Sequence, residues 1–246
     1  MTATTIAAIF FLLKRQEVLP RYRTAITLLG MVSVAATCNY VRLLLSWRET
    51  FQVVNGAVVQ TGVPYDDIYR YADWLLTVPM LLIALVLVLD LPLRQARMRS
   101  IILGSLAVEM IVLGYPGQIA TTMTTKWAWW IASMVPFFII IQQLYGSMSA
   151  AIRAQPVEAK RLISIARLVT VVTWSFYPIL YLIPTIFPAG SSAIVATQIG
   201  YAAADTVAKA VYGLFICWIA QSKSVNAEAA AATDAAFTAA ALAART

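Results

Sequence analysis

The chain has 246 residues, of which 61% are hydrophobic and only 12% are charged, whereas about a quarter of an average soluble chain is charged. A soluble domain needs a polar surface that this composition cannot supply, so an ordinary soluble enzyme is excluded. At about 20 apolar residues per membrane-spanning helix, the length accommodates about seven spans and no second catalytic domain. Histidine is absent, which excludes His-based catalysis and the commonest metal ligand. We therefore expect a membrane protein that is not an enzyme and binds no metal.

Seven apolar segments, bounded by charged residues or by proline and glycine, follow one another along the chain. They cover residues 3–19, 24–47, 68–89, 100–121, 127–147, 162–184 and 193–220. The first is the weakest, because the residues before Lys14 and Arg15 are too few to cross a hydrocarbon core of about 30 Å. Its charges follow the apolar run, which argues against a cleaved signal peptide. We expect an all-α, seven-transmembrane-helix bundle over residues 1–225 and an alanine-rich tail over 226–246.

Three smaller features lie outside this pattern. The longest connection, residues 48–67, contains a valine-rich run broken by Asn55-Gly56, which predicts a two-stranded hairpin. The tail is of low complexity and is predicted to be a frayed helix or disordered. Cys38 and Cys217 lie in apolar segments, which indicates buried free thiols and not a disulfide or a metal site.

Basic residues in the connections predict the orientation. Two of them, Arg48 and Lys126, lie on one side of the predicted bundle. Ten lie on the other side: Lys14, Arg15, Arg21, Arg23, Arg94, Arg97, Arg99, Arg153, Lys160 and Arg161. Because cytoplasmic loops carry the excess of lysine and arginine, we expect the N-terminus outside and the C-terminus in the cytoplasm. The formal net charge of +7 is then a topology signal, and it does not indicate binding to nucleic acid.

A few ionisable residues lie inside the predicted spans. Asp205 and Lys209 are four residues apart, and Arg70, Asp73 and Thr77 recur at three and four residues, so each set shares one helix face. A charge in the hydrocarbon is costly, and its default interpretation is functional. A structural ion pair between two helices is the alternative, although such a pair contributes little net stability. A lysine in an apolar core is also the environment of a Schiff-base nucleophile, because its neutral amine is favoured there.

These residues resemble a known family. Arg70-Tyr-Ala-Asp73-Trp-Leu-Leu-Thr77-Val-Pro79 and Asp205-Thr-Val-Ala-Lys209 are similar to the third and seventh helices of the microbial (type 1) rhodopsins, in particular the bacterial proton pumps of the proteorhodopsin and bacteriorhodopsin type. Further matches are Tyr40, Gly114-Tyr-Pro-Gly117, Trp129-Trp130 and Trp174-Ser-Phe-Tyr177-Pro178. The resemblance covers all but the first span and the tail.

The resemblance implies a covalently bound all-trans retinal. Lys209 would carry it as a protonated Schiff base, with Asp73 and Asp205 as counter-ions and Asp73 as the proton acceptor. Thr77 would hydrogen-bond Asp73, and Arg70 would stabilise both carboxylates as anions. Two residues of the second span, Asn39 and Tyr40, would tune the counter-ions.

The resemblance also implies a retinal pocket. An aromatic stripe at positions 174, 177 and 181 is by itself more typical of core packing, and only the lysine motif favours a pocket. The implied pocket residues are Trp74, Leu81, Met110, Gly114, Trp130, Ser133, Phe137, Trp174, Tyr177, Pro178 and Tyr181.

Three departures from the family pattern bear on function. The proton donor, a carboxylate eleven residues after the acceptor, is replaced by Ala84, and the resulting Asp-Thr-Ala motif is closest to the group without a donor carboxylate. Asn39 stands where related pumps have a histidine. Residues 184–200 contain no acid, so the outer carboxylate pair that serves proton release is missing. An aspartate at position 73 argues against chloride and sodium pumps.

Glu109, next to Met110 in the fourth span, has no role that the resemblance implies. Three interpretations stay open. Glu109 is a structural partner of Arg42, within one chain or across a protomer interface, or it stays protonated, or it is a substitute proton donor. Its expected depth and direction favour the structural role, because neighbouring residues on a helix point about 100° apart.

We predict a light-driven outward proton pump, a multi-pass homo-oligomer surrounded by lipid in the bacterial inner (cytoplasmic) membrane. Its reprotonation should be slow because Ala84 supplies no proton. The alternative is a photosensory rhodopsin that signals through a partner protein. A more distant alternative is a seven-helix transporter or receptor without retinal.

Overall fold

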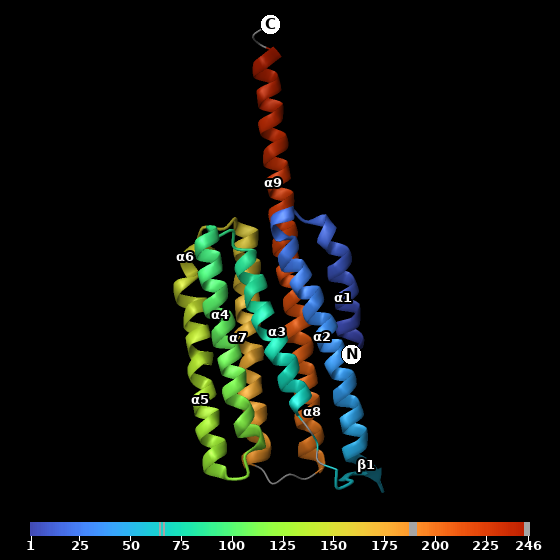
Figure 1. The fold of residues 1–246 in the computed structure, drawn as a ribbon. Helices are drawn as coiled ribbons and strands as arrows, with labels where there is room; N and C mark the ends of the chain where they lie inside the picture. The colour runs from blue at the N-terminus through green and yellow to red at the C-terminus, as the bar shows by residue number, and fades with distance from the viewer. Residues whose placement is uncertain (64, 66, 187–190, 244–246) are drawn as a thin grey trace.

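The structure, a computed structural model, describes residues 1–63, 65, 67–186 and 191–243. Within these residues it is a bundle of helices with one two-stranded hairpin (Figure 1). The long helices are α1 (Thr2–Lys14), α2 (Pro20–Thr50), α3 (Ile68–Leu87), α4 (Leu93–Ile119), α5 (Met123–Gln142), α7 (Val157–Ile186), α8 (Ser191–Thr206) and α9 (Tyr212–Ala243). The short elements are the 3₁₀-helix η1 (Arg15–Glu17), α6 (Ser149–Arg153) and two π-helical turns, η2 (Gln143–Ser147) and η3 (Val207–Val211).

The helices form seven columns, because η2 and α6 continue α5, and η3 joins α8 to α9. Successive columns pack side by side from α1 to α5, and α7 packs against both α8 and α9. Contacts of α9 with α2 and α3 close the bundle. We call the end that carries strands β1 and β2 the hairpin end, and the end from which α9 projects the tail end (Figure 1). The all-α bundle expected from the sequence is confirmed.

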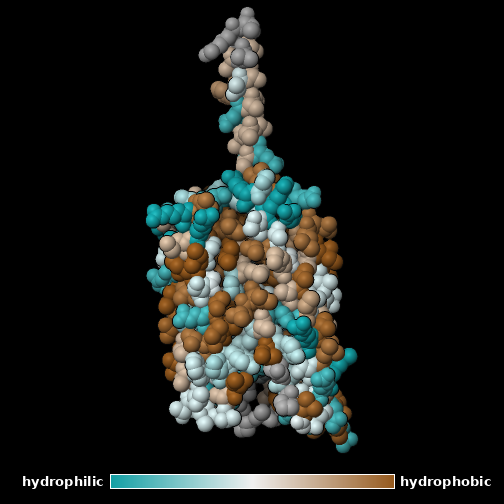
Figure 2. Space-filling model, in the orientation of Figure 1, coloured by the Kyte–Doolittle hydropathy of each residue, from teal (hydrophilic) through white to brown (hydrophobic). Residues whose placement is uncertain are grey.

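Six of the described helical segments are long and apolar enough to cross a membrane. They are Pro20–Thr50, Ile68–Leu87, Leu93–Ile119, Met123–Ser147, Val157–Ile183 and Ala193–Ala241, and each overlaps one of the predicted spans. Figure 2 shows apolar side chains over the sides of the bundle and hydrophilic side chains gathered at the tail end. The sides therefore have the surface that lipid requires.

The first predicted span is wrong in its extent. Helix α1 has 13 residues, about 20 Å at 1.5 Å per residue, and it gives way to η1 at Arg15. It still belongs to the bundle, because Phe11 is fully buried and packs against Gly213 of α9. A Cβ atom at Gly213 would lie only 2.5 Å from Cζ of Phe11, so glycine is what permits this close approach.

The predicted hairpin is confirmed. Strand β1 (Phe51–Val54) pairs antiparallel with β2 (Ala57–Gln60). Asn55 and Gly56 between them have φ values of 52° and 78°, which is the left-handed pair that a type I′ turn requires.

The tail and the cysteines differ in part from expectation. Residues 226–243 continue α9 as an exposed helix beyond the bundle (Figure 1), because alanine has the highest helix propensity. Both cysteines are free, as expected; Cys217 is buried, but Cys38 is exposed. The prediction of burial was wrong for Cys38, since its side of α2 faces away from the bundle.

Candidate functional site

Lys209 lies at the centre of the bundle, in the π-helical turn η3. Its side chain is 1% exposed, and Nζ forms ion pairs with Asp73 of α3 and, at 3.2 Å, with Asp205 of α8. Both carboxylate side chains are also buried. The charged faces recognised in the sequence therefore meet, and a π-helical turn in an α-helical span is often associated with a functional site.

The two carboxylates have different surroundings. Asp205 accepts hydrogen bonds from Tyr40 Oη at 2.6 Å, Tyr177 Oη at 2.6 Å and Trp74 Nε1 at 3.0 Å. Asp73 bonds Lys209 through Oδ2, whereas its buried Oδ1 has no hydrogen-bond partner among the residues that the structure describes. Asp205 is thus stabilised as an anion by three fixed donors, and Asp73 keeps an oxygen that can take a proton.

Two of the tuning residues, Thr77 and Asn39, bond main-chain carbonyls of their own helices. Thr77 Oγ1 donates to the main-chain carbonyl of Asp73 at 2.8 Å and not to its carboxylate. Asn39 Nδ2 donates to the carbonyl of Ala35 at 3.1 Å. Each thus bonds a carbonyl four residues earlier in its own helix, a local bond that competes with longer contacts.

Arg70 pairs with neither counter-ion in the described structure. Its Nε lies 3.3 Å from Asp67 Oδ1, its Nη2 donates to Gln198, and its guanidinium lies 4.5 Å from the ring centroid of Tyr201. Any stabilisation of the two carboxylates as anions by Arg70 would therefore act through space, without a direct contact, and it stays a prediction. The sequence analysis missed these partners, although the spacing of three residues between Asp67 and Arg70 is a signal for a pair on one helix face.

A cavity extends from Lys209 between α3, α4, α5 and α7. All eleven pocket positions implied by the sequence resemblance line it. It is also lined by six residues that the sequence analysis missed: Tyr71, Val78, Ile111, Met134, Tyr201 and Ala208. The positions 71, 74, 78 and 81 are spaced by three and four residues on one face of α3. Helical periodicity starting from Trp74 would therefore have predicted Tyr71 and Val78, two of the six.

The cavity lining fits a long, flat, apolar group attached to Lys209. Trp74 and Tyr177 lie edge to face with ring centroids 4.9 Å apart, and Trp130 Nε1 donates to the carbonyl of Pro178 at 3.2 Å. These contacts hold the aromatic side chains that line the cavity in place. Gly114 has no side chain, so the space beside the ring of Tyr71 stays free. The residues present therefore suit a covalently held polyene such as retinal.

Among the residues that the structure describes, the ion pairs of Lys209 are with Asp73 and Asp205, and no further carboxylate pairs with it from the tail-end side. Ala84 is fully buried among apolar side chains, so the expected absence of a donor there is not offset by a neighbour on α3. Glu109 is exposed on α4, where it lines a shallow groove with Pro79 and Gly104. The ion pairs of the described residues include neither Glu109 nor Arg42, which contradicts a pairing of the two within one chain.

Comparisons with known proteins agree with this arrangement. Residues 1–223 match the family model described as bacteriorhodopsin-like protein. The green-light absorbing proteorhodopsin of Gamma-proteobacterium EBAC31A08 is 27% identical over 231 residues, which cover 92% of this chain and 86% of that protein. Bacteriorhodopsin of Halobacterium salinarum is also 27% identical over 231 residues, covering 92% of this chain and 82% of that protein.

Solved structures show the same fold at higher identity. The crystal structure of thermophilic rhodopsin is 40% identical with a TM-score of 0.87, covering 92% of this chain and 90% of that one. The structure of xanthorhodopsin, a light-driven ion pump with dual chromophore, is 39% identical with a TM-score of 0.87, covering 92% of this chain and 91% of that one. The buried lysine between two aspartates, the aromatic cavity and these matches agree, and the chain belongs to the bacteriorhodopsin-like family of rhodopsins.

Proposed function

We propose that this chain is a light-driven outward proton pump that carries all-trans retinal on Lys209. Bound retinal supplies the absorption of light and a change of shape that moves the Lys209 nitrogen. The protein's part is to hold a proton on that nitrogen in the dark and to take it away in the light. Two carboxylates next to a buried cation meet the first requirement, because they offset its desolvation.

The unequal surroundings of Asp73 and Asp205 are the observation that carries the proposal. A proton on Asp205 would disrupt hydrogen bonds from Tyr40, Tyr177 and Trp74, each worth about 1.5–3 kcal/mol for a charged acceptor. A proton on Asp73 disrupts no such set, since its Oδ1 has no partner among the described residues. The proton of the Lys209 nitrogen is therefore expected to pass to Asp73.

The direction of transport follows from the orientation. The ten basic residues counted above belong to connections or helix ends on the tail-end side, which supports a cytoplasmic tail end and an outside hairpin end. Arg70 lies one turn from Asp73 toward the hairpin end. It carries a positive charge that would help to expel a proton outward. A bacterial inner membrane is the corresponding location.

Ala84 determines the rate in this proposal. Without a carboxylate between Lys209 and the tail end on α3, the returning proton must come from the cytoplasmic solution. Recovery should then be slow and should lengthen as the cytoplasmic pH rises.

The test uses unbuffered cells that express the chain with retinal. Illumination should acidify the medium, and a protonophore should abolish the signal. Asp73→Asn should keep a visible pigment but stop the acidification. Cells with bound pigment and no acidification would contradict the proposal.

A photosensor is the second candidate, and the exposed helix of residues 226–243 favours it, since a projecting helix offers a surface to a partner protein. Removal of residues 226–246 distinguishes the two. A pump should acidify the medium as before, whereas a sensor should lose its response to light in the cell and keep its pigment.

We also propose that the chain forms homo-oligomers. Arg42 on α2 and Glu109 on α4 are both exposed on the sides of the bundle, where an unpaired charge is costly. An ion pair between Arg42 of one copy and Glu109 of the next would relieve both costs. This interface joins two different surfaces of neighbouring copies. Repeated around an axis, such an interface forms a ring when the rotations between successive copies add up to a full turn.

A further inference from the structure

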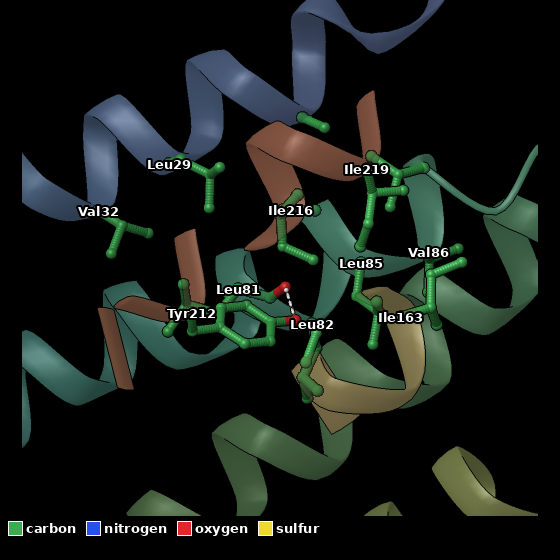
Figure 3. Close-up of a cluster of buried hydrophobic side chains, with 14 of the residues drawn as sticks. Leu29, Val32, Leu81, Leu82, Leu85, Val86, Ile163, Tyr212, Ile216 and Ile219 are labelled. Carbon is green, nitrogen blue, oxygen red and sulfur yellow. Dashed lines mark hydrogen bonds between the residues drawn. The ribbon is translucent and has the colours of Figure 1, made fainter. Parts of the chain in front are cut away.

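The tail-end half of the bundle contains a buried apolar region between Lys209 and the solvent. Figure 3 shows its side chains, which come from α2, α3, α7 and α9. They include Leu29, Val32, Leu82, Leu85, Val86, Ile163, Ile216 and Ile219, all at most 1% exposed. Asp73 and Asp90 are seventeen residues apart in sequence, about 25 Å at 1.5 Å per residue. A proton that returns from the tail end must cross this region.

Tyr212 places a hydroxyl group in the middle of this region. The residue is 2% exposed, and its Oη donates to the main-chain carbonyl of Leu81 at 3.1 Å (Figure 3). Leu81 follows Asp73 by eight residues and precedes Asp90 by nine, so the hydroxyl divides the path into two steps of about 12–14 Å. The hydroxyl of Thr170, from α7, lies next to the Tyr212 phenol and is also buried.

The hydroxyl belongs to a line of polar contacts between α3 and the last column. At the centre, Lys209 pairs with Asp73. At the tail end, Lys223 of α9 donates to the carbonyl of Val88 at 2.8 Å and pairs with Asp90 at 2.6 Å. The contact of Tyr212 with the Leu81 carbonyl lies between these two. We call this line the α3–α9 seam.

Asp90 is the end of the seam that solvent can reach. Its side chain is 34% exposed, and it accepts a hydrogen bond from Tyr22 Oη at 2.5 Å. Lys223 is held in place by Gln155 Oε1 at 2.7 Å. Solvent therefore reaches the Asp90 carboxylate, while hydrogen bonds and the ion pair hold the rest of the cluster in place.

We propose that the α3–α9 seam is the route by which the Lys209 nitrogen regains its proton, with Asp90 as the entry and the Tyr212 hydroxyl as the relay that replaces the carboxylate absent at Ala84. Water that enters along the seam brings a proton to the Tyr212 oxygen. The phenol passes its own proton to the next water toward Lys209, so it gains and loses one proton and carries no net charge. This inference rests on the proposed function, since it concerns the return step of the same site.

The test is Tyr212→Phe in the full-length pigment in lipid vesicles, followed by flash spectroscopy. Return of the proton to the Lys209 nitrogen should slow about tenfold or more, because a positioned proton-transfer group contributes at least that much. The resting absorption and the transfer to Asp73 should not change. Tyr145→Phe is the matched control, because Tyr145 is an exposed residue of η2 and takes no part in the contacts of the seam. Equal return rates in Tyr212→Phe and the unaltered protein would overturn the proposal.

A second arm separates a relay from a packing effect. In an Ala84→Asp background, a carboxylate one turn beyond Leu81 bypasses the hydroxyl, so Tyr212→Phe should lose most of its effect. The same slowing factor in both backgrounds would overturn the relay. If Tyr212→Phe yields no pigment, Thr170→Val tests the neighbouring hydroxyl, and an unchanged return rate would count against the proposal.

A third readout does not depend on the photocycle rate. Backbone hydrogen exchange of residues 81–88 should speed up under illumination if water enters the seam, and less so in Tyr212→Phe. Identical exchange in the two proteins would overturn the proposal. If Tyr212→Phe slows the return of the proton but cells do not acidify the medium, the proton route along the seam is supported and the proposed pump function is refuted. If cells acidify the medium and Tyr212→Phe does not change the rate of return, the pump function is supported and the proton route along the seam is refuted.

Discussion

The hydrogen bonds to Asp205 should decide which carboxylate takes the proton. The double substitution Tyr40→Phe/Tyr177→Phe removes two of the three side-chain donors and keeps both rings, leaving Trp74 Nε1 at 3.0 Å. Each bond to a charged acceptor is worth about 1.5–3 kcal/mol. The preference of the proton for Asp73 over Asp205 should therefore fall by about 3–6 kcal/mol, or roughly 10²–10⁴-fold in the ratio of the two protonated forms.

The assay is light-induced infrared difference spectroscopy of the carboxyl C=O stretch. In the unaltered pigment the band should belong to Asp73, and in the double variant a second band should appear that is lost when Asp205→Asn is added. Tyr201→Phe is the matched control, because its ring lies 5.7 Å from that of Trp74 and its hydroxyl is not among the hydrogen-bond donors to Asp205 within the described residues. A double variant with the unaltered spectrum, or an equal change in Tyr201→Phe, would refute the reasoning.

Three further changes test packing, the missing donor and the interface. Gly213→Ala should destabilise the protein by about 1–3 kcal/mol in thermal unfolding, because its Cβ would lie 2.5 Å from Cζ of Phe11. Phe11→Leu should restore part of the loss, and equal destabilisation by Gly213→Ala with Phe11 or Leu at position 11 would contradict this contact. Ala84→Asp should speed recovery and flatten its dependence on cytoplasmic pH in flash spectroscopy; a cycle as slow and as pH-dependent as before would count against the donor argument. Glu109→Gln should weaken the oligomer in cross-linking and size analysis, and Arg42→Gln should weaken it to a similar extent; an unchanged oligomer in both variants would rule out the pair.

The pocket was largely predictable because its residues lie on regular helices. Periodicity fixes which side chains share a face, so Trp74, Trp174 and Tyr177 could be placed around Lys209 from spacing and resemblance alone. The hairpin was predictable for a similar reason, since Asn-Gly has few alternatives to a type I′ turn. In both cases a local rule determines the geometry.

Contacts between distant segments were not predictable in the same way. Arg70 had several possible partners, and its contact with Gln198 depends on how α3 and α8 meet at the hairpin end. The exposure of Glu109 and Cys38 depends on helix rotation, which composition does not encode. The end of α1 at Lys14, by contrast, lies beside two local features, the salt bridge of Lys14 with Glu17 at 2.6 Å and the start of α2 at Pro20.

Ala84 connects the stability of the folded protein with the rate at which the proton should return to Lys209. A carboxylate there would lie in a core where Leu81, Leu85 and Ile216 are at most 1% exposed, and burying it without partners would cost several kcal/mol. With alanine at position 84, the region packs without a buried carboxylate there. The hydroxyl of Tyr212 donates a hydrogen bond to the main-chain carbonyl of Leu81 at 3.1 Å. In the proposed pump, the same packing should limit the entry of water into the return path in the dark and so oppose an inward leak of protons past Lys209. A slow return of the proton is the consequence that the proposal expects from this apolar core.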